Sequence, residues 1–319
     1  MPQHVRIGTR ASALALTQTG HVSVDLAALA DLEIETVRVR TDGDRLTGSL
    51  ATLGGTGVFV TALRDALLDG RCDVAVHSLK DLPTGDAPGL VLGAVPERQD
   101  PRDALCARDG LTLAELPAGA VIGTGSPRRA AQLRAARPDV VVVDIRGNVD
   151  TRLGRVAGAE HGPGDLDAVV LARAGLARLD RLDAVTELFD PAVMAPAPGQ
   201  GALAVEVRAG EPGDAPLAVA LRALDHLPTR LAVVAERALL ARLEAGCAAP
   251  IGALATVSAD EIRLDAVVAR PDGTATLRRS AAALPGDRPE ADALALGARL
   301  AEDLLGAGAA ELAELGTAR

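Results

Sequence analysis

The chain has 319 residues and a net charge of −10, and it contains two Phe but neither Tyr nor Trp. Single hydrophobic cores stop growing near ~250–300 residues, so this length favours more than one domain. The negative charge repels phosphate backbones and aromatic stacking platforms are almost absent, which disfavours a nucleic-acid-binding protein.

The cysteines and the apolar pattern indicate the compartment. Three cysteines, Cys72, Cys106 and Cys247, are odd in number and widely spaced, which does not fit a disulfide framework and suits a reducing cytosol. The start of the chain lacks the apolar core and cleavage pattern of a signal peptide. No stretch approaches the ~18 apolar residues of a membrane span. We therefore expect a soluble, cytoplasmic protein whose core is filled by Ala, Val, Leu and Ile.

The first block of the chain, to about Glu97, alternates strands with helices. Ser12 is a candidate N-cap for the first helix. Strand, helix and strand in succession predict parallel strands with right-handed crossovers. The expected strands are residues 5–8, 35–40, 73–77 and 90–95, and the expected helices are 12–30 and 57–69.

A second block of the same kind follows a charged, proline-containing segment at residues 97–103, where we place a domain crossing. It ends at the Pro/Gly-rich residues 195–201, and the next strand, 203–207, is expected to return to the first domain. Two crossings make a hinge between two α/β lobes, and a cleft between such lobes is a usual ligand site. The expected strands are 120–123, 140–145 and 168–172, and the expected helices are 126–136 and one after Asn148.

The third block reads as a small α+β domain, because strands are followed by helices. A helix at 229–243 precedes a loop at 244–250 that carries Cys247. Strands are expected at 253–257, 262–269 and 274–280, with helices from about residue 290. The domains predicted from this pattern are 1–98 with 199–220, then 99–198, then 221–319.

Lys80 and Asp81 lie just past the carboxyl end of the strand 73–77. Open α/β sheets place their ligands at this edge, so the pair is a candidate site. The alternative is a surface ion pair worth under ~1 kcal/mol. The dipeptide alone leaves both interpretations open.

The segment from Gly123 to Arg129 has a more specific pattern. A strand ends in a glycine turn, Ser126 can be an N-cap, and a proline occupies the first helical position. Arg128 and Arg129 then fall in the first helical turn, where the helix dipole disfavours cations. Two guanidinium groups beside free backbone N–H groups predict a site for carboxylates or phosphates, which we favour over two solvated arginines.

Further basic residues occupy equivalent turns. Arg146 and Arg152 flank another strand-to-helix turn of the second lobe, and Arg10 with Ser12 holds the matching place in the first. We expect these arginines, Arg128, Arg129 and Lys80 to converge on one cleft. Such a reversal of charge in an acidic protein indicates a ligand with several anionic groups.

Cys247 is preceded by Gly246 and followed by two alanines and Pro250, so its loop has no apolar periodicity to bury it. Cys72 and Cys106 lie in apolar, strand-like contexts and are expected to be buried and inert. A Cys–His nucleophile is disfavoured, because no His lies near Cys247 in the sequence. From the residues alone, Cys247 is an accessible thiol of unknown role.

Taken together, these segments resemble the hydroxymethylbilane synthase family, in order and approximate spacing, over essentially the whole chain. The matching stretches are 6–10 with Ser12, 54–59, 77–83, 100–104, 123–129, 146–152, 199–202 and 243–252.

The resemblance implies two lobes like type II periplasmic binding proteins and a third domain that carries a cofactor loop. It implies a dipyrromethane cofactor attached to Cys247 by a thioether, and deamination of porphobilinogen with head-to-tail joining of four units. Hydrolysis then releases hydroxymethylbilane. A cytoplasmic monomer without a metal is the form that the family leads us to expect.

The resemblance also implies residue roles. Asp81 would be the catalytic group and would also contact the cofactor. The cofactor side chains would be held by Lys80, Thr124, Ser126, Arg128, Arg129 and Arg146. The incoming substrate would be bound by Arg10, Ser12, Arg152 and Gln200.

The chain departs from the family pattern at three positions. Lysines are common in the glycine-rich loop where this chain has Thr52 and Thr56, and a serine is frequent at the position of Gly125. Losing two cations is expected to weaken the loop's hold on acidic chains without abolishing activity.

Two other classes of function are compatible with parts of the pattern. An intracellular two-lobed anion-binding protein without catalysis would need no third domain presenting a thiol. A cysteine hydrolase would need a His within reach of Cys247. The enzyme that the resemblance implies accounts for more of the chain than either.

Overall fold

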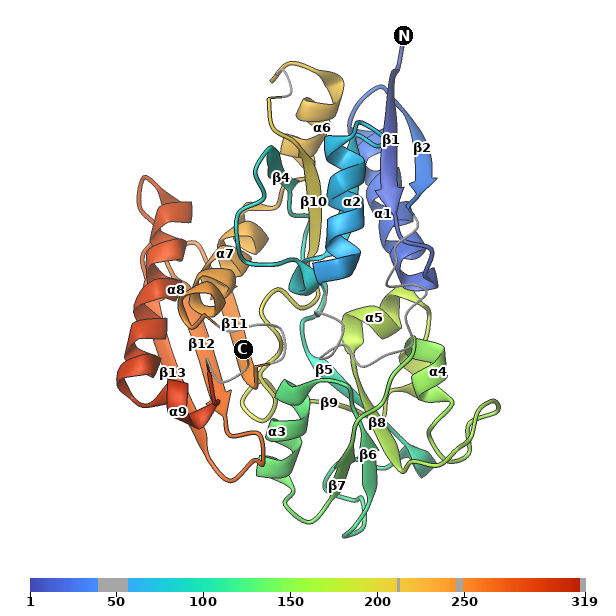
Figure 1. Ribbon diagram of the computed structural model, residues 1–319, viewed down its shortest axis with the longest axis vertical. Helices are drawn as coiled ribbons and strands as arrows, with labels where there is room; N and C mark the ends of the chain where they lie inside the picture. Colours follow the sequence, from blue (N-terminus) through green and yellow to red (C-terminus); the bar gives the residue numbers. More distant parts are fainter. Residues whose placement is uncertain (40–56, 211–212, 245–248, 316–319) are drawn as a thin grey trace. The chain divides into compact units, whose positions relative to one another are not determined.

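The computed structural model describes residues 1–39, 57–210, 213–244 and 249–315. The chain divides into two compact units (Figure 1): Met1–Gln99 with Ala202–Arg230, and Asp100–Gly201 with Leu231–Arg319. No helix in the described residues is long and apolar enough to cross a membrane.

The first unit contains a five-stranded sheet in the order β2-β1-β3-β10-β4. Strands β1 to β3 are parallel, and β10 runs antiparallel between β3 and β4. The expected return of the strand 203–207 is therefore confirmed, but the sheet is mixed rather than wholly parallel. The strands are β1 (Gln3–Thr9), β2 (Leu32–Arg38), β3 (Val74–Ser78), β4 (Leu90–Ala94) and β10 (Leu203–Arg208).

Helices cover both faces of this sheet. Val74 and Val76 of β3 pack in one cluster with α1 (Ala13–Leu29) and α6 (Pro216–Leu224). Ala75 packs in another with α2 (Gly57–Leu68). Alternate residues of a strand point to opposite faces, so β3 has helices on both sides. The N-cap expected at Ser12 is confirmed, because its side chain accepts a hydrogen bond from the Ala15 amide at 3.3 Å.

The second unit begins with another five-stranded sheet, in the order β7-β6-β8-β5-β9. Strand β5 runs antiparallel to β8, whereas β6 is parallel to both β7 and β8. The strands are β5 (Asp103–Ala107), β6 (Val121–Gly123), β7 (Val141–Val143), β8 (Ala168–Ala172) and β9 (Glu187–Leu188), and the helices are α3 (Pro127–Ala136), α4 (Val149–Leu153) and α5 (Arg173–Arg178).

The sequence analysis missed β5, and α5 and α6 with it. Asp103, the first residue of β5, closes a charged segment that reads as a loop. A four-residue apolar run after such a segment is too short to identify a strand without its neighbours.

The C-terminal part of the second unit has a three-stranded antiparallel sheet and helices, as expected from the sequence. Its core is aliphatic and is built from both helices and strands, as with Leu239, Leu264 and Leu300. The division into three domains at the residues given above stays a prediction. The elements are α7 (Leu227–Arg242), β11 (Ile251–Val257), β12 (Ile262–Ala269), β13 (Thr276–Ala283), α8 (Pro289–Gly306) and α9 (Ala309–Leu312).

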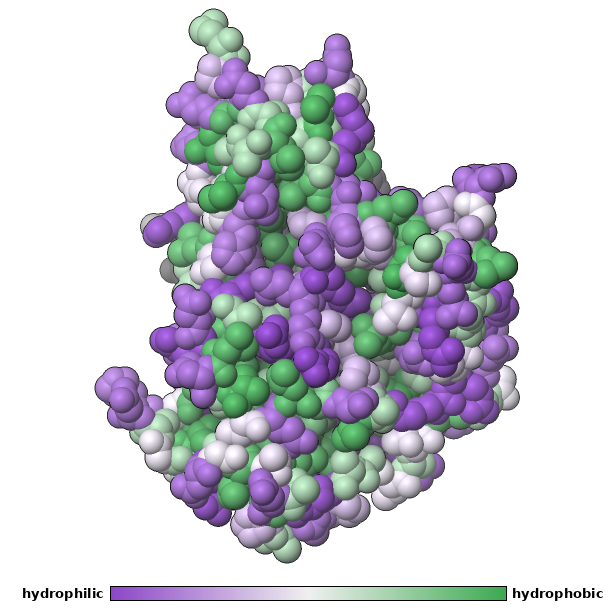
Figure 2. Space-filling view, turned by 180° about the vertical axis from the view of Figure 1, so that it is seen from behind, coloured by the Kyte–Doolittle hydropathy of each residue, from purple (hydrophilic) through white to green (hydrophobic). Residues whose placement is uncertain are grey.

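The surface carries exposed apolar side chains on several elements, such as Val24 of α1 and Leu294 of α8. Figure 2 shows hydrophilic and hydrophobic residues interspersed over one face of the molecule. No group of three or more His, Cys, Asp or Glu residues in the described parts of the chain could hold a metal ion.

Candidate active site

The Lys80–Asp81 pair lies on a short 3-10 turn, η2 (Leu79–Asp81), directly after β3. Buried Leu79 anchors the turn, and its amide donates to the Ala202 carbonyl oxygen at 3.0 Å. Lys80 and Asp81 are half-buried. The turn is thus held at the carboxyl edge of the sheet, where α/β folds place their ligands.

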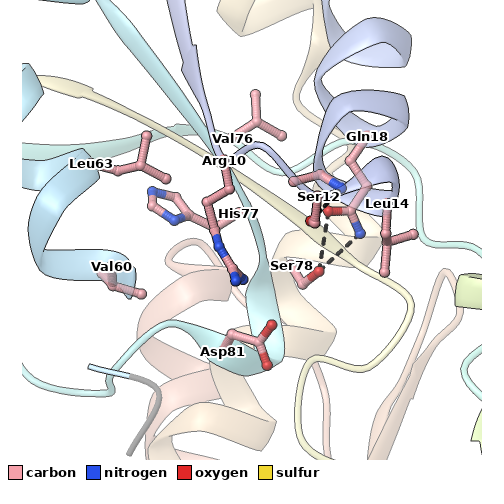
Figure 3. A pocket seen from close by; sticks show the side chains of 11 residues that line it. Arg10, Ser12, Leu14, Gln18, Val60, Leu63, Val76, His77, Ser78 and Asp81 are labelled. Carbon is pink, nitrogen blue, oxygen red and sulfur yellow. Dashed lines mark hydrogen bonds between the residues drawn. The ribbon is translucent and has the colours of Figure 1, made fainter. Parts of the chain in front are cut away.

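A pocket of the first unit lies at this edge (Figure 3). Arg10 and Asp81 both line it, and the Arg10 side chain extends toward the Asp81 carboxylate. Val60 and Leu63 of α2 supply an apolar wall. The pocket therefore combines one cation, one carboxylate and apolar surface, which suits a flat ligand that carries both N–H and acidic groups.

Polar side chains around this pocket form hydrogen bonds and ion pairs with one another. Gln18 donates through Nε2 to the Ser78 hydroxyl at 2.9 Å. On the α2 side of the sheet, Glu206 of β10 accepts from Arg64 Nη2 at 2.8 Å and lies 3.1 Å from His77 Nε2. Burial alone would raise the pKa of Glu206, but its contacts with His77 and Arg64 lower it to about 2. His77 is one of the residues lining the pocket, so this network supports the pocket from beneath.

In the second unit, the expected start of α3 is confirmed. Ser126 is the N-cap, accepting from the Arg129 amide at 3.5 Å, and a proline occupies the first turn. The departure at Gly125 has a steric reason: a Cβ there would lie 2.6 Å from the Ile145 carbonyl oxygen. A serine at 125 would require the backbone at 145 to shift. Thr124 is buried, and its hydroxyl accepts from the Ser126 amide at 3.3 Å.

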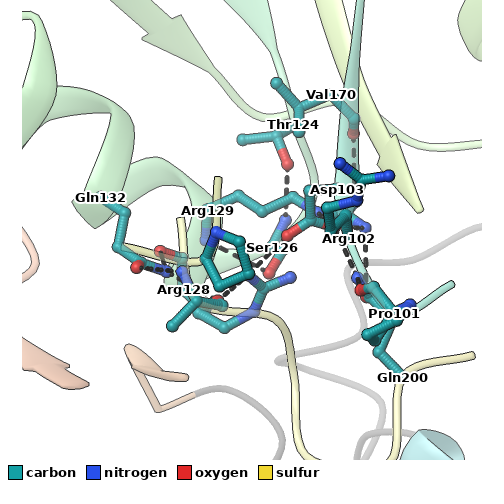
Figure 4. Close-up of polar contacts among 12 residues, drawn as sticks. Pro101, Arg102, Asp103, Thr124, Ser126, Arg128, Arg129, Gln132, Val170 and Gln200 are labelled. Atoms are coloured by element: carbon teal, nitrogen blue, oxygen red, sulfur yellow. Dashed lines mark hydrogen bonds and ion pairs between the residues drawn. The ribbon is translucent and has the colours of Figure 1, made fainter. Parts of the chain in front are cut away.

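Arg128 and Arg129 are buried, at 4% and 5% exposure, and they share one carboxylate, Asp103 (Figure 4). Arg128 Nη1 lies 2.7 Å from one oxygen of Asp103, and Arg129 Nε donates to the other at 2.9 Å. Gln200, also buried, donates to Asp103 at 2.8 Å and to the Pro101 carbonyl oxygen at 2.7 Å. The sequence analysis expected two arginines whose guanidinium N–H groups are available to bind an anion. The structure instead shows much of that donor capacity engaged by an internal carboxylate.

Burial and the neighbouring charges shift the pKa values of this cluster. Burial alone would raise the pKa of Asp103, but the charges of Arg128 and Arg129 hold it well below its usual range. Burial lowers the pKa of Arg128. Both contacts of Arg128 with Asp103 and with the Ala195 carbonyl oxygen use Nη1, and its buried Nε has no hydrogen-bond partner among the described residues.

Arg146 precedes α4 and Arg152 lies in its last turn, and the N-cap Asn148 accepts from the Thr151 amide at 2.8 Å. Arg146 is exposed and pairs with Asp144 at 3.2 Å. Burial and the positive charges of Arg129 and Arg146 lower the pKa of Arg152. Arg152 is therefore repelled by Arg129 and by Arg146, a condition that a bound anion would relieve.

The expected site residues divide between the two units. Arg10, Ser12, Lys80 and Asp81 belong to the first unit, and Thr124, Ser126, Arg128, Arg129, Arg146, Arg152 and Gln200 belong to the second. Cys247, Thr52 and Thr56 lie outside the described residues.

The other two cysteines are buried, as expected. Burial raises the pKa of Cys72, and it raises the pKa of Cys106 to about 12, so neither is a ready thiolate.

Two groups of functional interest were missed from the sequence, Asp103 and the Glu206–Arg64 pair. Asp103 lies within one of the family-like stretches, 100–104, yet no local pattern assigns a role to it. Arg64 and Glu206 are 142 residues apart in the chain, so no spacing rule links them.

Family models and similar proteins of known name point to one family. A family model described as "Porphobilinogen deaminase, dipyromethane cofactor binding domain" matches residues 5–214, and "Porphobilinogen deaminase, C-terminal domain" matches residues 230–306. The chain is 59% identical to porphobilinogen deaminase of Leifsonia xyli over 98% of this chain and 94% of that protein. It is 54% identical to the protein of that name from Thermobifida fusca, over 96% of this chain and 95% of the relative.

Among solved structures, immunogenic lipoprotein A of Vibrio vulnificus matches 68% of this chain and 94% of its own chain, with 11% identity and a TM-score of 0.40.

Proposed function

We infer that the residues described above carry the reaction of the porphobilinogen deaminase family, to which this chain belongs. The chain deaminates porphobilinogen and joins four units head to tail to give linear hydroxymethylbilane. The dipyrromethane cofactor supplies the pyrrole carbon on which the chain of units grows. The roles of individual side chains are our proposal.

The donor set of the second unit fits this cofactor. Each pyrrole carries an acetate and a propionate, so a bound chain of pyrroles presents several carboxylates. Arg128 keeps a buried Nε without a hydrogen-bond partner among the described residues, and it shares one carboxylate with Arg129, which leaves an excess positive charge. Guanidinium donors of this kind match carboxylates. The cofactor carboxylates would be held by Lys80, Thr124, Ser126, Arg128, Arg129 and Arg146.

The observation that carries the proposed reaction centre is the pocket shared by Arg10 and Asp81. The Asp81 carboxylate accepts hydrogen bonds from pyrrole N–H groups and stabilises the positive charge that develops as ammonia leaves. Arg10, which lines the same pocket, binds a carboxylate of the incoming substrate. The incoming substrate would be bound by Arg10, Ser12, Arg152 and Gln200.

Cys247 is proposed as the attachment residue for the cofactor. The other two cysteines support this by elimination, because both are buried and their thiol pKa values are raised. We also propose that the enzyme acts in the cytoplasm as a monomer. Its three domains would be 1–98 with 199–220, 99–198 and 221–319.

The test is the intact mass of the purified protein. We expect the active protein to be heavier than its sequence by two pyrrole units. Cys247→Ser should lack this adduct and be inactive, while Cys72→Ser and Cys106→Ser should keep both the adduct and the activity. An active Cys247→Ser protein, or an adduct mapped to another residue, would refute the attachment. Binding of porphobilinogen without any product would favour the non-catalytic anion-binding alternative.

A further inference from the structure

Asp103 is a buried carboxylate to which the proposed reaction assigns no task. It is 0% exposed and begins β5, beside Ala172 of β8. Both of its oxygens are engaged: Oδ2 by Arg128 Nη1 at 2.7 Å, and Oδ1 by Arg129 Nη2 at 2.8 Å and Gln200 Nε2 at 2.8 Å. One side chain thus orients three others that come from two different segments (Figure 4).

The geometry also determines which donors of the two arginines are left over. Arg129 uses Nε and Nη2 on Asp103 and Nη1 on the Val170 carbonyl oxygen at 3.0 Å. Arg128 uses Nη1 for Asp103 and for the Ala195 carbonyl oxygen, and its Nε has no hydrogen-bond partner among the described residues. Arg129 therefore contributes to the cofactor site mainly through its charge, whereas Arg128 keeps its Nε edge for a ligand.

The charges of the cluster support the same division of roles. Two buried guanidinium groups in contact with one carboxylate leave one net positive charge in a region where water cannot screen it. Without Asp103 the two cations would repel each other, and α3 could not present both in one geometry. With Asp103 in place, one excess charge remains to attract an anion.

We propose that Asp103 is a positioning residue for cofactor capture: it fixes Arg129 and Gln200 in place and aims the free edge of Arg128 at a cofactor carboxylate. This rests on the proposed function, in which Arg128 contacts the dipyrromethane. Asp103 itself touches neither substrate nor cofactor.

The first test is Asp103→Asn, which preserves shape and removes the charge. Charge-assisted hydrogen bonds are worth enough to change occupancy at least about ten-fold. We expect the folded variant to carry the adduct in about a tenth or less of its molecules, as measured by intact mass. Activity per adduct-bearing molecule should fall much less, since Asp103 does not contact the reacting atoms.

Asp167→Asn is the matched control. Asp167 lies in the same unit and accepts from Arg108 Nε at 2.7 Å and from the Val121 amide at 2.7 Å. Its loss removes an arginine partner and lowers the melting temperature without touching α3, so the control should keep the full adduct. Equal loss of adduct in both variants would mean that general destabilisation is the cause, and would overturn the proposal.

Asp103→Glu covers the case in which Asp103→Asn does not fold. It keeps the charge, but the longer side chain cannot hold Arg128, Arg129 and Gln200 in the same places. We expect it to fold and still lose most of the adduct. A folded Asp103→Glu protein with full adduct, or one that also fails to fold, would leave Asp103 with a purely structural role and overturn the inference.

Arg128→Gln separates this inference from the proposed function. If Arg128→Gln loses the adduct while the folded Asp103 variants keep it, the positioning role is wrong and the contact of Arg128 with the cofactor stands. If Arg128→Gln keeps the full adduct, the proposed contact itself is wrong.

Discussion

The position of the Asp81 carboxylate is determined by the turn that carries it. It is half-buried on a turn that is anchored by Leu79, and it lines the same pocket as Arg10. A carboxylate at the wall of a pocket can meet N–H groups of a ligand and remain partly hydrated before the ligand binds. Ligand binding displaces that water, and a preorganised charge stabilises a transition state most strongly where water is excluded.

Asp81→Asn should lower turnover by about 10²–10³-fold, because the amide keeps the size of the side chain but removes the charge that faces the developing cation. The melting temperature should stay close to that of the parent. Asp86→Asn, at an exposed position in the connection after η2, is the control and should retain activity. Steady-state rates and thermal melts measure both properties, and turnover of Asp81→Asn within a few-fold of the parent would show that the assigned role is incorrect.

At the scale of elements, α2, β3 and β10 are joined by charge as well as by apolar packing. Arg64 of α2 holds Glu206 of β10 through two nitrogens, and Glu206 lies 3.1 Å from His77 of β3. The carboxylate is 4% exposed, so breaking this arrangement leaves an uncompensated charge in the interior. The network lies beside the apolar wall of the pocket and therefore connects the stability of the lobe to the shape of the site.

This network predicts an acid-sensitive part of the folding free energy. The pKa of Glu206 is lowered from 4.5 to about 2, so its contribution is complete above pH 4.5 and is lost as pH falls toward 2. At about 1.36 kcal/mol per pKa unit, this shift corresponds to roughly 3 kcal/mol. Glu206→Gln should be less stable than the parent at pH 7, and the difference should shrink through that window.

Melts of both proteins between pH 7 and pH 2 check this expectation. Glu33→Gln, an exposed change in β2, should track the parent at every pH. A gap between the parent and Glu206→Gln that stays constant down to pH 2 would contradict the assignment of this acid sensitivity to Glu206.

At the scale of the whole molecule, the residues proposed to bind anions belong to two different units of the chain. Arg10 belongs to the first unit, and Arg128 and Arg152 belong to the second. The cofactor would be held chiefly by groups of the second unit, while binding of the incoming substrate would draw on both units. Capture of the cofactor and elongation should therefore respond to different substitutions.

Arg10→Gln and Arg152→Gln should carry the adduct but elongate poorly, whereas Arg128→Gln should fail to acquire it. Each lost contact to a carboxylate is worth ~1.5–3 kcal/mol, or about ten-fold or more in occupancy. Mass spectra of the resting proteins, taken with and without porphobilinogen, report both properties. Arg71→Gln and Arg263→Gln, which remove exposed arginines from the first and second unit, are the charge controls. Full adduct on Arg128→Gln together with none on Arg152→Gln would reverse this division.

The sequence by itself determined the features that depend on a few neighbouring residues or on the order of motifs along the chain. The caps Ser12 and Ser126, the helix after Asn148 and the strands 168–172 and 262–269 were predicted where the structure has them, because capping and side-chain periodicity act within a few residues. The family was likewise predicted from ordered motifs. The residue roles stay predictions, including that of Cys247, which lies outside the described residues.

Only the tertiary structure decided which charges meet. Asp103 joins Arg128 across 25 residues of chain and Gln200 across 97, and Arg64 reaches Glu206 across 142. No local rule pairs residues at such separations, because their meeting depends on how β5 and β10 enter their sheets antiparallel after the chain crosses between units. Asp103, Val170 and Ala195, which come from three separate segments, surround the two buried arginines at the start of α3. The physical reason is that burial and ion pairing depend on packing between distant segments, and packing exists only in the folded chain.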